Sequence, residues 1–306
     1  MKDLSIIIVN YNVCEYLVNC INSIYKNISG ISFEIIVVDN HSLDGSIEAI
    51  KNKFPGVCLI ENTDNVGFSK ANNQAISVAK GNYIFLLNPD TLLLDNSILK
   101  MLTYFKKYKQ NCLIAPKILN ADYSLQYSAW MDKNLKVIFQ EALRIFISKY
   151  SVIGIKNPFL VENVFGSAML FSKELISSVG NLDENLFFMD DFDFCYRVRK
   201  NGGSVIYFPD CSIIHYGGKS SGNDLKLFYA NDNISKLKFY KKHFSLLKYF
   251  LSSILILFHI LAYSFWLLFS SWRSANHRRQ LKAYLFTARA FFQYLFSGDD
   301  SLIFTR

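Results

Sequence analysis

Several motifs that would assign a common function are missing from this chain. It has no G-x-G-x-x-G and no G-K-[ST] motif, which disfavours a dinucleotide-binding fold and a phosphate-binding P-loop. Its six cysteines are scattered without a Cys-x-x-Cys pair, so we expect reduced cysteines packed as small apolar groups in a cytosolic setting. Because the first residues run directly into a strand-like stretch, we expect no signal peptide.

Net positive charge is scarce in most of the chain and concentrated near its end. Residues 241–306 hold nine Lys or Arg and two Asp or Glu, whereas the preceding 240 residues are almost neutral. The basic residues flank an apolar stretch, which favours a membrane surface over nucleic acid as the partner, so we expect no nucleic acid. With 306 residues, 51% of them hydrophobic, the chain can bury a large core and carry an appendage.

The first ~115 residues alternate strand-like and helix-like patterns. The strand-like runs are short and apolar, and they span 4–9, 33–38, 57–60, 83–87 and 112–115. The helix-like segments carry apolar residues at helical spacing or polar starts, and they span 14–28, 44–54, 67–79 and 95–108. This alternation predicts an α/β fold with a mostly parallel central sheet flanked by helices.

The pattern past residue 118 is less regular. We expect helices over 135–146 and 190–200, a short strand at 205–208, and an apolar run over 164–171. That run contains Gly166-Ser167-Ala168, where small residues would let a ligand approach the backbone. The helix over 190–200 carries acids in its first turn and bases near its end, which suits the helix dipole. Within it, we expect Asp193 to pair with Arg197 four residues later.

Polar residues follow three of the predicted strands. Asn10-Tyr11-Asn12 comes after the first strand, Asp39 after the second, and Asn88-Pro89-Asp90 after the fourth. The carboxyl ends of parallel strands share one rim, and open α/β sheets bind their ligands there. This arrangement therefore predicts a nucleotide site.

Six segments in order resemble glycosyltransferase family 2, with the GT-A fold, in its rhamnosyltransferase-like branch. Each segment alone is weakly specific, but together they cover about residues 4 to 220. They are SIIIVNYN at 5–12, EIIVVDNHSLDGS at 34–46, NVGF at 65–68 with AN at 71–72, LNPD at 87–90, FGSA at 165–168 and DDFDFCYR at 190–197. The resemblance implies an inverting transferase that uses a nucleotide-sugar donor.

The resemblance assigns donor binding to residues of the rim. Asp39 would recognise the nucleobase, since a carboxylate accepts the imide N–H of uracil or thymine. A loop-ordering acid is the alternative, because the segment after Asp39 is rich in turn-forming residues. The nucleotide-binding residues would be Asn10, Tyr11, Asn12, Asp39, Asn65, Asn72 and Asn88.

A divalent cation, Mg²⁺ or Mn²⁺, is implied as the cofactor that neutralises the departing diphosphate. Asp90 would hold it, because both ions prefer oxygen ligands. The family's triplet is Asp-x-Asp, whereas this chain has the uncharged Asn88 at the first position, so only one carboxylate remains. His215 would be a second metal ligand, with a structural histidine as the alternative. A plain turn is the alternative for Asn88-Pro89-Asp90.

Asp191 would be the catalytic base, because the acceptor hydroxyl must lose its proton as it attacks the anomeric carbon. The branch implies dTDP-rhamnose as donor and a lipid-linked (polyprenyl-linked) or surface polysaccharide glycan as acceptor. A UDP-hexose donor, such as UDP-galactose or UDP-N-acetylglucosamine, is an alternative. A catalytically silent membrane partner is another, which Asn88 permits. Gln126 and Trp130 lie in the acceptor-side segment without an assigned role.

The C-terminal part is expected to meet a membrane. Residues 249–272 include no Lys, Arg, Asp or Glu, and a bilayer needs ~20 apolar residues. Basic residues flank both ends, which favours a re-entrant pair or an interfacial helix, followed by a second helix over 284–296. A soluble helix buried in a partner is the alternative. We therefore expect a catalytic domain over 1–240, a membrane-associating segment over 241–306, and a location on the cytoplasmic face of the inner membrane.

Overall fold

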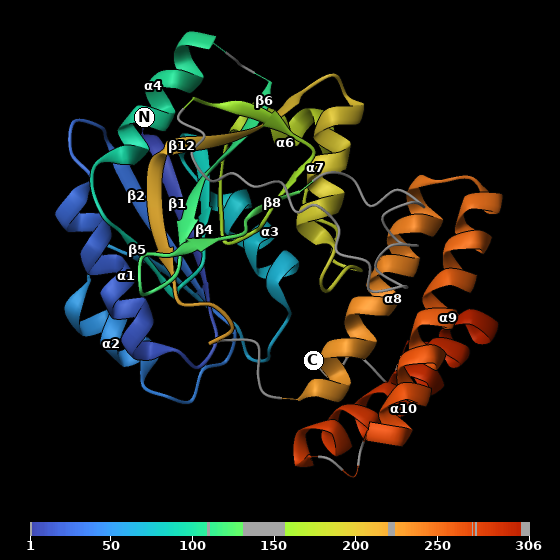
Figure 1. Ribbon diagram of the computed structural model, residues 1–306. Coiled ribbons are helices and arrows are strands. Elements are labelled where there is room, and N and C mark those ends of the chain that lie inside the picture. The colour runs from blue at the N-terminus through green and yellow to red at the C-terminus, as the bar shows by residue number, and fades with distance from the viewer. Residues whose placement is uncertain are drawn as a thin grey trace. The chain divides into compact units, whose positions relative to one another are not determined.

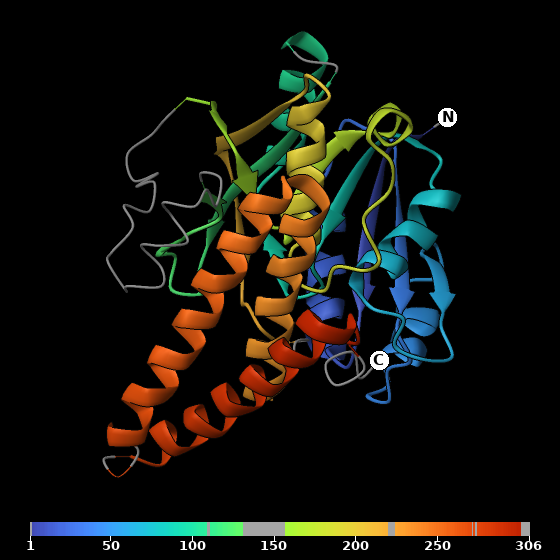
Figure 2. The ribbon, with the colours of Figure 1, turned by 90° about the vertical axis from the view of Figure 1, so that its right-hand side faces the viewer.

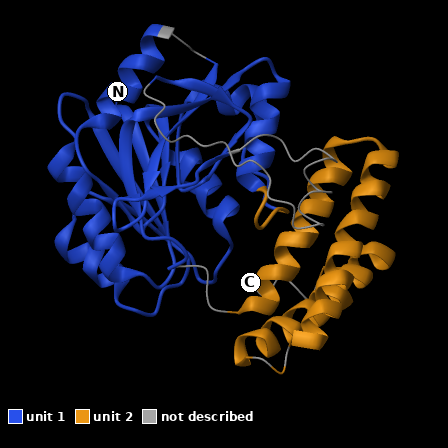
Figure 3. Ribbon diagram, in the orientation of Figure 1, with its two compact units in different colours: residues 1–131, 150–184, 190–222 blue, residues 132–149, 185–189, 223–306 orange. Residues whose placement is uncertain are grey.

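The computed structural model describes residues 2–108, 111–130, 157–219, 224–270, 272 and 274–300. They form two compact units, which Figure 3 distinguishes by colour. Unit 1 contains the described residues up to 184 and those of 190–219, and unit 2 contains 185–189 and the described residues from 224 onward. The units divide near residue 222, whereas the sequence predicts a boundary after residue 240. The predicted helix over 135–146 lies outside the described residues.

Unit 1 is built on a sheet with the strand order β3-β2-β1-β4-β11-β6-β12-β5 (Figure 1). These strands are β1 (Lys2–Asn10), β2 (Phe33–Asp39), β3 (Cys58–Glu61), β4 (Gly81–Leu87), β5 (Thr91–Leu93), β6 (Cys112–Leu119), β11 (Ala168–Ser172) and β12 (Ser204–His215). Two shorter strands pair at its margin, β7 (Leu125–Gln126) with β6 and β9 (Phe159–Val161) with β12. A separate pair joins β8 (Ala129–Trp130) to β10 (Asn163–Val164).

The sheet is mixed rather than uniformly parallel. Strands β3, β2, β1 and β4 run parallel, as do β6 and β12. Strand β11 runs antiparallel between β4 and β6, and β5 runs antiparallel to β12. The apolar run over 164–171 is not one strand, because a turn at Gly166-Ser167 separates β10 from β11. The turn leads from the β8–β10 pair into the main sheet.

Apolar side chains bury both faces of the sheet. In β1, Leu4, Ile6 and Ile8 face one hydrophobic cluster, while Ile7 and Val9 face the other. A strand with both faces covered needs a near-continuous apolar run, which Ile6 to Val9 provide. The first cluster includes side chains of α1 (Cys14–Asn27), α2 (Ser46–Lys53) and α4 (Ser97–Tyr108). The second includes side chains of α3 (Phe68–Val78), α6 (Lys173–Val179) and α7 (Asp190–Lys200).

The strand register brings the three polar groups of the sequence to one edge. Strand β1 lies between β2 and β4, and its last residue, Asn10, pairs with Asp39 at the end of β2. Asn88 follows β4 directly on the other side of β1. The carboxyl ends of three adjacent parallel strands therefore present these residues together.

Unit 2 is helical (Figure 2). It contains α8 (Leu225–His243), α9 (Leu246–Ser270) and α10 (Ala275–Ser297), and each of these helices packs against the other two. Among the described residues, α9 is the one helix that is long and apolar enough to cross a membrane. The helix predicted over 284–296 is part of α10, which begins nine residues earlier.

Candidate active site

The ends of β1 and β2 are locked together by buried polar side chains. The Asn10 amide donates to Asp39 Oδ2 at 2.8 Å and to Ser42 Oγ at 3.0 Å, and the Ser42 backbone N–H donates to Asp39 Oδ1 at 2.7 Å. Asn10 and Asp39 are almost fully buried. Both carboxylate oxygens of Asp39 therefore accept internal hydrogen bonds, as expected of a loop-ordering acid, and each oxygen retains a lone pair for a ligand N–H. Ser42 was not assigned a role from sequence.

The loop after β1 is fixed by the same serine. The Asn12 backbone N–H donates to Ser42 Oγ at 2.9 Å, and the Leu43 backbone N–H donates to Asn12 Oδ1 at 2.8 Å. Asn12 has a φ of 53°, a left-handed conformation that Asn tolerates better than most residues. Tyr11 is partly buried beside it. Their role in nucleotide binding stays a prediction.

Asn65 and Asn72 make local hydrogen bonds. Asn65 Oδ1 accepts from the backbone N–H of Gly67 at 3.1 Å, in the turn before α3. The Asn72 amide donates to the Phe68 carbonyl oxygen at 2.9 Å, one helical turn earlier. These bonds give both residues a structural function, and a contact with nucleotide stays a prediction.

The structure brings Asp90 and His215 together, although 125 positions separate them in the sequence. Strand β5 begins directly after Asp90 and pairs antiparallel with the end of β12, where Thr91 is the partner of His215. The Tyr216 backbone N–H donates to the Asp90 carbonyl oxygen at 2.9 Å. As a result, His215 Nε2 lies 3.3 Å from Asp90 Oδ1, and both side chains are largely buried.

Gln126 fixes the proton of His215. Its amide nitrogen donates to Asn120 Oδ1 at 3.0 Å and to the His215 carbonyl oxygen at 3.4 Å, so its Oε1 is the atom 2.8 Å from His215 Nδ1. A carbonyl oxygen only accepts, and therefore Nδ1 carries the proton and Nε2 of the neutral ring is an acceptor. In the neutral ring, Nε2 and Asp90 Oδ1 are both acceptors, and they lie 3.3 Å apart. The sequence alone gives Gln126 no role, because its partner His215 is 89 positions away in the chain.

This donor set fits a divalent cation. It offers a carboxylate oxygen from Asp90 and an imidazole nitrogen from His215, whose other nitrogen donates to a carbonyl, as is usual for metal-ligating histidines. Asn88 Oδ1 is buried without a hydrogen-bond partner, and the Asn88 amide nitrogen lies 3.4 Å from His215 Nε2. Among the described residues, no group of three or more His, Cys, Asp or Glu converges. Mg²⁺ is commonly held by one or two protein carboxylates with substrate phosphates and water.

Asp191 is connected to the same site through the turn before β11. Its Oδ2 accepts from the Gly166 backbone N–H at 2.9 Å. The next carbonyl of that turn, on Ser167, accepts from the Asn88 backbone N–H at 2.9 Å. Ser167 Oγ is buried without a hydrogen-bond partner, as is Asn88 Oδ1. Buried polar groups without partners are rare, and these two lie at the turn that joins Asp191 to Asn88.

Asp190, which directly precedes the predicted base Asp191, has a raised pKa. Burial, followed by the negative charge of Asp191, raises the pKa of Asp190 to about 8, while a hydrogen bond from Ser69 Oγ at 3.1 Å opposes the shift. The raised pKa favours the protonated form of Asp190, which reduces the negative charge beside Asp191.

The predicted pairing of Asp193 with Arg197 is confirmed. Arg197 Nε donates to Asp193 Oδ2 at 2.7 Å, and its other nitrogens donate to carbonyl oxygens of Val179, Gly180 and Asn181. Asp193 is fully buried. This acid is therefore committed to holding α7 against the end of α6, which leaves Asp190 and Asp191 for chemistry.

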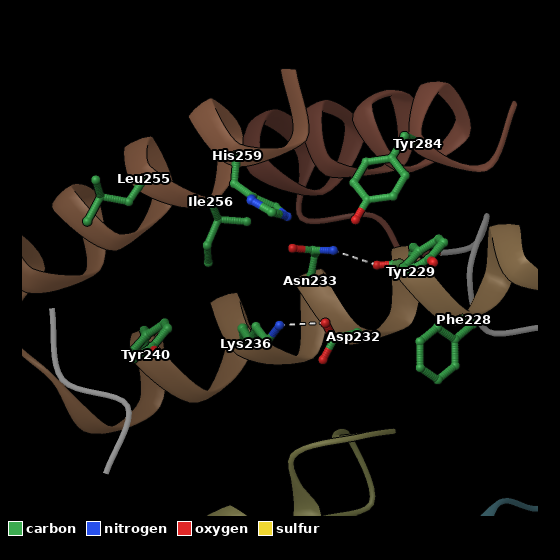
Figure 4. Close-up of a pocket in the computed structure, with 10 residues that line it drawn as sticks. All are labelled: Phe228, Tyr229, Asp232, Asn233, Lys236, Tyr240, Leu255, Ile256, His259 and Tyr284. Carbon is green, nitrogen blue, oxygen red and sulfur yellow. Dashed lines mark hydrogen bonds and ion pairs between the residues drawn. The ribbon is translucent and has the colours of Figure 1, made fainter. Parts of the chain in front are cut away.

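Unit 2 contains a cavity of about 130 Å³ (Figure 4). The residues that line it are Phe228, Tyr229, Asp232, Asn233, Lys236, Tyr240, Leu255, Ile256, His259 and Tyr284. None of these is a predicted site residue. The cavity is therefore a feature of the helical unit and not of the rim.

Comparison with solved structures defines the class of fold. A mannosyltransferase from Pyrobaculum calidifontis, solved in complex with GDP-Man and Mn²⁺, matches 98% of this chain with a TM-score of 0.58 at 15% identity, and 90% of that chain is covered. At this identity the likeness concerns the fold. It confirms the predicted α/β architecture of GT-A type.

The family follows from the sequence match. The model of glycosyl transferase family 2 matches residues 5–178, more than half of the chain, and the chain belongs to this family. A low-salt glycan biosynthesis hexosyltransferase of Haloferax volcanii is 27% identical over 221 residues, 70% of this chain and 66% of that protein. An N-acetylglucosaminyl-diphospho-decaprenol L-rhamnosyltransferase of Mycobacterium tuberculosis is 23% identical over 216 residues, 62% of this chain and 68% of that protein. These matches support the prediction of a hexosyltransferase.

Proposed function

We propose that this protein is an inverting glycosyltransferase that moves a sugar, with rhamnose the first choice, from a nucleotide-diphosphate donor to a glycan. Membership of family 2 supports the reaction class. A relative that is named as an L-rhamnosyltransferase acting on a diphospho-decaprenol supports dTDP-rhamnose as donor and a polyprenyl-linked glycan as acceptor. The proposal includes a role in the assembly of a surface polysaccharide such as O-antigen.

One observation carries the proposal: a single turn ties the two acids that a transferase needs. Gly166 donates to Asp191, and Ser167 accepts from Asn88, two residues before Asp90. A base for the acceptor and a ligand for the diphosphate side are thereby linked to the same turn by hydrogen bonds. Rigid placement of reacting groups lowers the barrier by removing the entropy cost of bringing them together.

Different residues of the chain have different roles in the transfer. Asp191 takes the proton of the acceptor hydroxyl as its oxygen forms the new bond to the anomeric carbon and the bond to the diphosphate breaks on the opposite face. Because this is a single in-line displacement, the anomeric configuration inverts. The raised pKa of Asp190 favours its protonated form and so limits the negative charge beside Asp191. Asp39, with Asn10 and Ser42, holds the nucleobase edge.

Asp90 and His215 would hold a divalent cation, and Gln126 would keep His215 Nε2 unprotonated for it. The cation would supply positive charge to the departing diphosphate. The likeness to a fold solved with Mn²⁺ supports Mn²⁺ or Mg²⁺ in this role.

A UDP-hexose is the second candidate donor. The Asp39 carboxylate accepts an imide N–H, which uracil and thymine share, so this side chain does not separate the two bases. We place the enzyme on the cytoplasmic face of the inner membrane, held by unit 2. The support for this location is the apolar helix α9 with its basic flanks.

The test is a thermal-shift panel with dTDP-rhamnose, UDP-galactose and UDP-N-acetylglucosamine, each with and without Mn²⁺. We expect one donor to raise the melting temperature, and Mn²⁺ to enlarge the shift. Asp39→Asn should remove most of the shift, whereas Asp210→Asn, at an exposed acid of unit 1, should keep it. If no donor stabilises the protein, with or without Mn²⁺, the proposed function is wrong.

A further inference from the structure

Helix α9 has the reverse polarity of a helix in a water-soluble protein. All four of its serines are buried, whereas every exposed side chain after Lys248 is apolar. These exposed residues are Phe250, Leu251, Ile254, Phe258, Leu261, Ala262, Phe265, Trp266, Leu268 and Phe269. We call them the outer face of α9. An apolar patch that runs the length of a 25-residue helix marks a surface for a non-aqueous partner.

Three of the four buried serines have their hydrogen-bond partner within the helix, and Ser252 Oγ is buried without one. Ser253, Ser264 and Ser270 donate to the carbonyl oxygens of the residues four positions earlier, at 2.8, 2.7 and 3.1 Å. Small residues of this kind let neighbouring helices approach closely, as they do in membrane proteins. The inner face of α9 is therefore built for packing against helices, and its outer face is left for the surroundings.

Polar groups from all three helices turn toward the interior of unit 2 (Figure 4). His259 is the one histidine in the apolar stretch of α9. It lines the cavity with Asn233 of α8 and Tyr284 of α10. Asp232 and Lys236 of α8 form an ion pair at the same cavity. In membrane proteins, charged and polar side chains likewise face the interior of the helix bundle and pair with one another.

The packing of α10 argues against α9 crossing a bilayer. Tyr263 of α9 donates to Gln280 Oε1 at 3.4 Å, and its ring lies 4.5 Å from that of Tyr284. On these turns α10 also exposes Arg279 and Lys282. If α9 crossed, the two cations would enter the hydrocarbon beside it, which is costly. With α9 in the plane of the interface, they remain at the level of the headgroups.

The charges of unit 2 match an anionic lipid surface. The exposed side of α10 alternates bases with apolar groups at spacings of three and four, which places them on one helical face. This basic stripe of α10 consists of Arg278, Lys282, Leu285, Arg289, Phe292 and Phe296. Exposed lysines at 241, 242 and 248 lie near the other end of α9. Cations at both ends of an apolar face are typical of a helix that lies in an anionic interface.

We propose that unit 2 binds the surface of an anionic bilayer with α9 in the plane of the interface. The outer face of α9 enters the boundary between headgroups and acyl chains, and the basic stripe of α10 contacts the headgroups. The inference deepens the membrane location and rests on the proposed function for its purpose, a lipid-linked acceptor. Vesicle binding requires no sugar transfer, so the two can fail separately.

The first test measures partition of the full chain onto vesicles of phosphatidylcholine with and without phosphatidylglycerol. We expect binding that phosphatidylglycerol strengthens. The double variant Phe258→Glu with Phe265→Glu should lower it at least about tenfold, because two large apolar groups no longer enter the interface. The matched control is Leu43→Glu with Leu160→Glu, at exposed leucines of unit 1, and it should bind like the parent. Circular dichroism verifies that each variant keeps its helices.

A triple variant tests the contribution of charge. Arg278→Ser, Lys282→Ser and Arg289→Ser together should lower binding to phosphatidylglycerol vesicles about a hundredfold, since each basic residue contributes about fivefold near an anionic surface. Binding to pure phosphatidylcholine should change little. No vesicle binding by the parent, or equal binding by parent and Phe258→Glu/Phe265→Glu variant, would overturn the proposal.

The second test distinguishes an α9 that lies in the membrane interface from an α9 that crosses the bilayer. In inverted inner-membrane vesicles, a membrane-impermeant maleimide should label the thiol introduced by Trp272→Cys, between α9 and α10. Native Cys58, which is exposed in unit 1, serves as the reference in the same sample. We expect both thiols to react from the same side. If Cys58 were labelled only from one side of the membrane and the introduced thiol only from the other, α9 would cross the bilayer.

Discussion

The two units of this protein place their polar side chains according to opposite needs. In unit 1, apolar residues fill both faces of the sheet, and buried polar residues collect at the ends of the strands. In unit 2, the inner face of α9 holds buried serines with Ile256, Ile260 and Leu267, and most of its other large apolar side chains are exposed. The difference shows that burial of a polar group has no single meaning. At the rim, unpartnered atoms such as Asn88 Oδ1 point to a ligand, whereas in α9 three of the four serine hydroxyls donate to carbonyl oxygens of their own helix.

The largest expected effect is on turnover, and it compares the loss of a buried acid in unit 1 with the loss of a buried serine in unit 2. Asp191→Asn should lower turnover by about 10²–10⁴, because the acceptor hydroxyl loses its base. Donor binding should persist, since Asp191 holds no part of the nucleotide. Ser264→Ala, at a buried polar residue of α9, should leave turnover unchanged. Steady-state kinetics and a donor thermal shift measure both, and full activity of Asp191→Asn would exclude it as the base.

The second prediction compares two phenylalanines. Phe85→Ala, at a fully buried position of β4, should lower the free energy of unfolding by about 3–5 kcal/mol through the cavity it leaves. Phe265→Ala, on the outer face of α9 and 63% exposed, should lower it by less than about 0.5 kcal/mol in lipid-free solution. Urea unfolding followed by circular dichroism measures both changes. Equal costs would mean that Phe265 is buried in the folded protein.

The third prediction concerns the cation ligands. His215→Asn should weaken the effect of Mn²⁺ on donor binding by removing one ligand. Gln126→Leu should weaken it about 10–100-fold while keeping both ligands, because His215 loses the acceptor that orients its ring. Calorimetric titration of the protein with Mn²⁺, in the presence of a nucleoside diphosphate, measures the change in Mn²⁺ affinity. If Gln126→Leu left the affinity unaltered, the assigned proton on Nδ1 would be wrong.

The smallest expected effect is a pH dependence of stability. The raised pKa of Asp190 means that the folded protein binds a proton which the unfolded chain releases near its ordinary value. This contribution is complete below the unfolded pKa and is lost as pH rises through about 8. Asp190→Asn should therefore flatten the decline of stability between pH 5 and 8, by urea unfolding. Asp210→Asn, at an exposed acid, should leave the slope as it is.

Long, well-marked elements were predictable from sequence. The helix over 190–200 was predicted with the bounds of α7, because acids begin it, bases end it and a glycine follows. The rim was predictable as well, since parallel strands bring their carboxyl ends together whatever the loops do. The order of the motifs was sufficient for the family, which the match over residues 5–178 confirms.

The approach of His215 to Asp90 was beyond local sequence reasoning. It depends on β5, a three-residue strand that directly follows the Asn-Pro-Asp turn and pairs with a strand more than 110 residues later. The role of Gln126 depends on a two-residue strand, β7, paired to β6. Such short elements have no periodicity of their own, and only tertiary pairing defines them.

The measurement that tests the central claim most directly is release of nucleoside diphosphate. The full chain, Mn²⁺ and a lipid-linked glycan extract are incubated with dTDP-rhamnose, UDP-galactose or UDP-N-acetylglucosamine. We predict release from one donor that depends on the acceptor and falls by about 10²–10⁴ in Asp191→Asn. Absence of release from every donor, or equal release by the Asp191→Asn variant, would contradict the account.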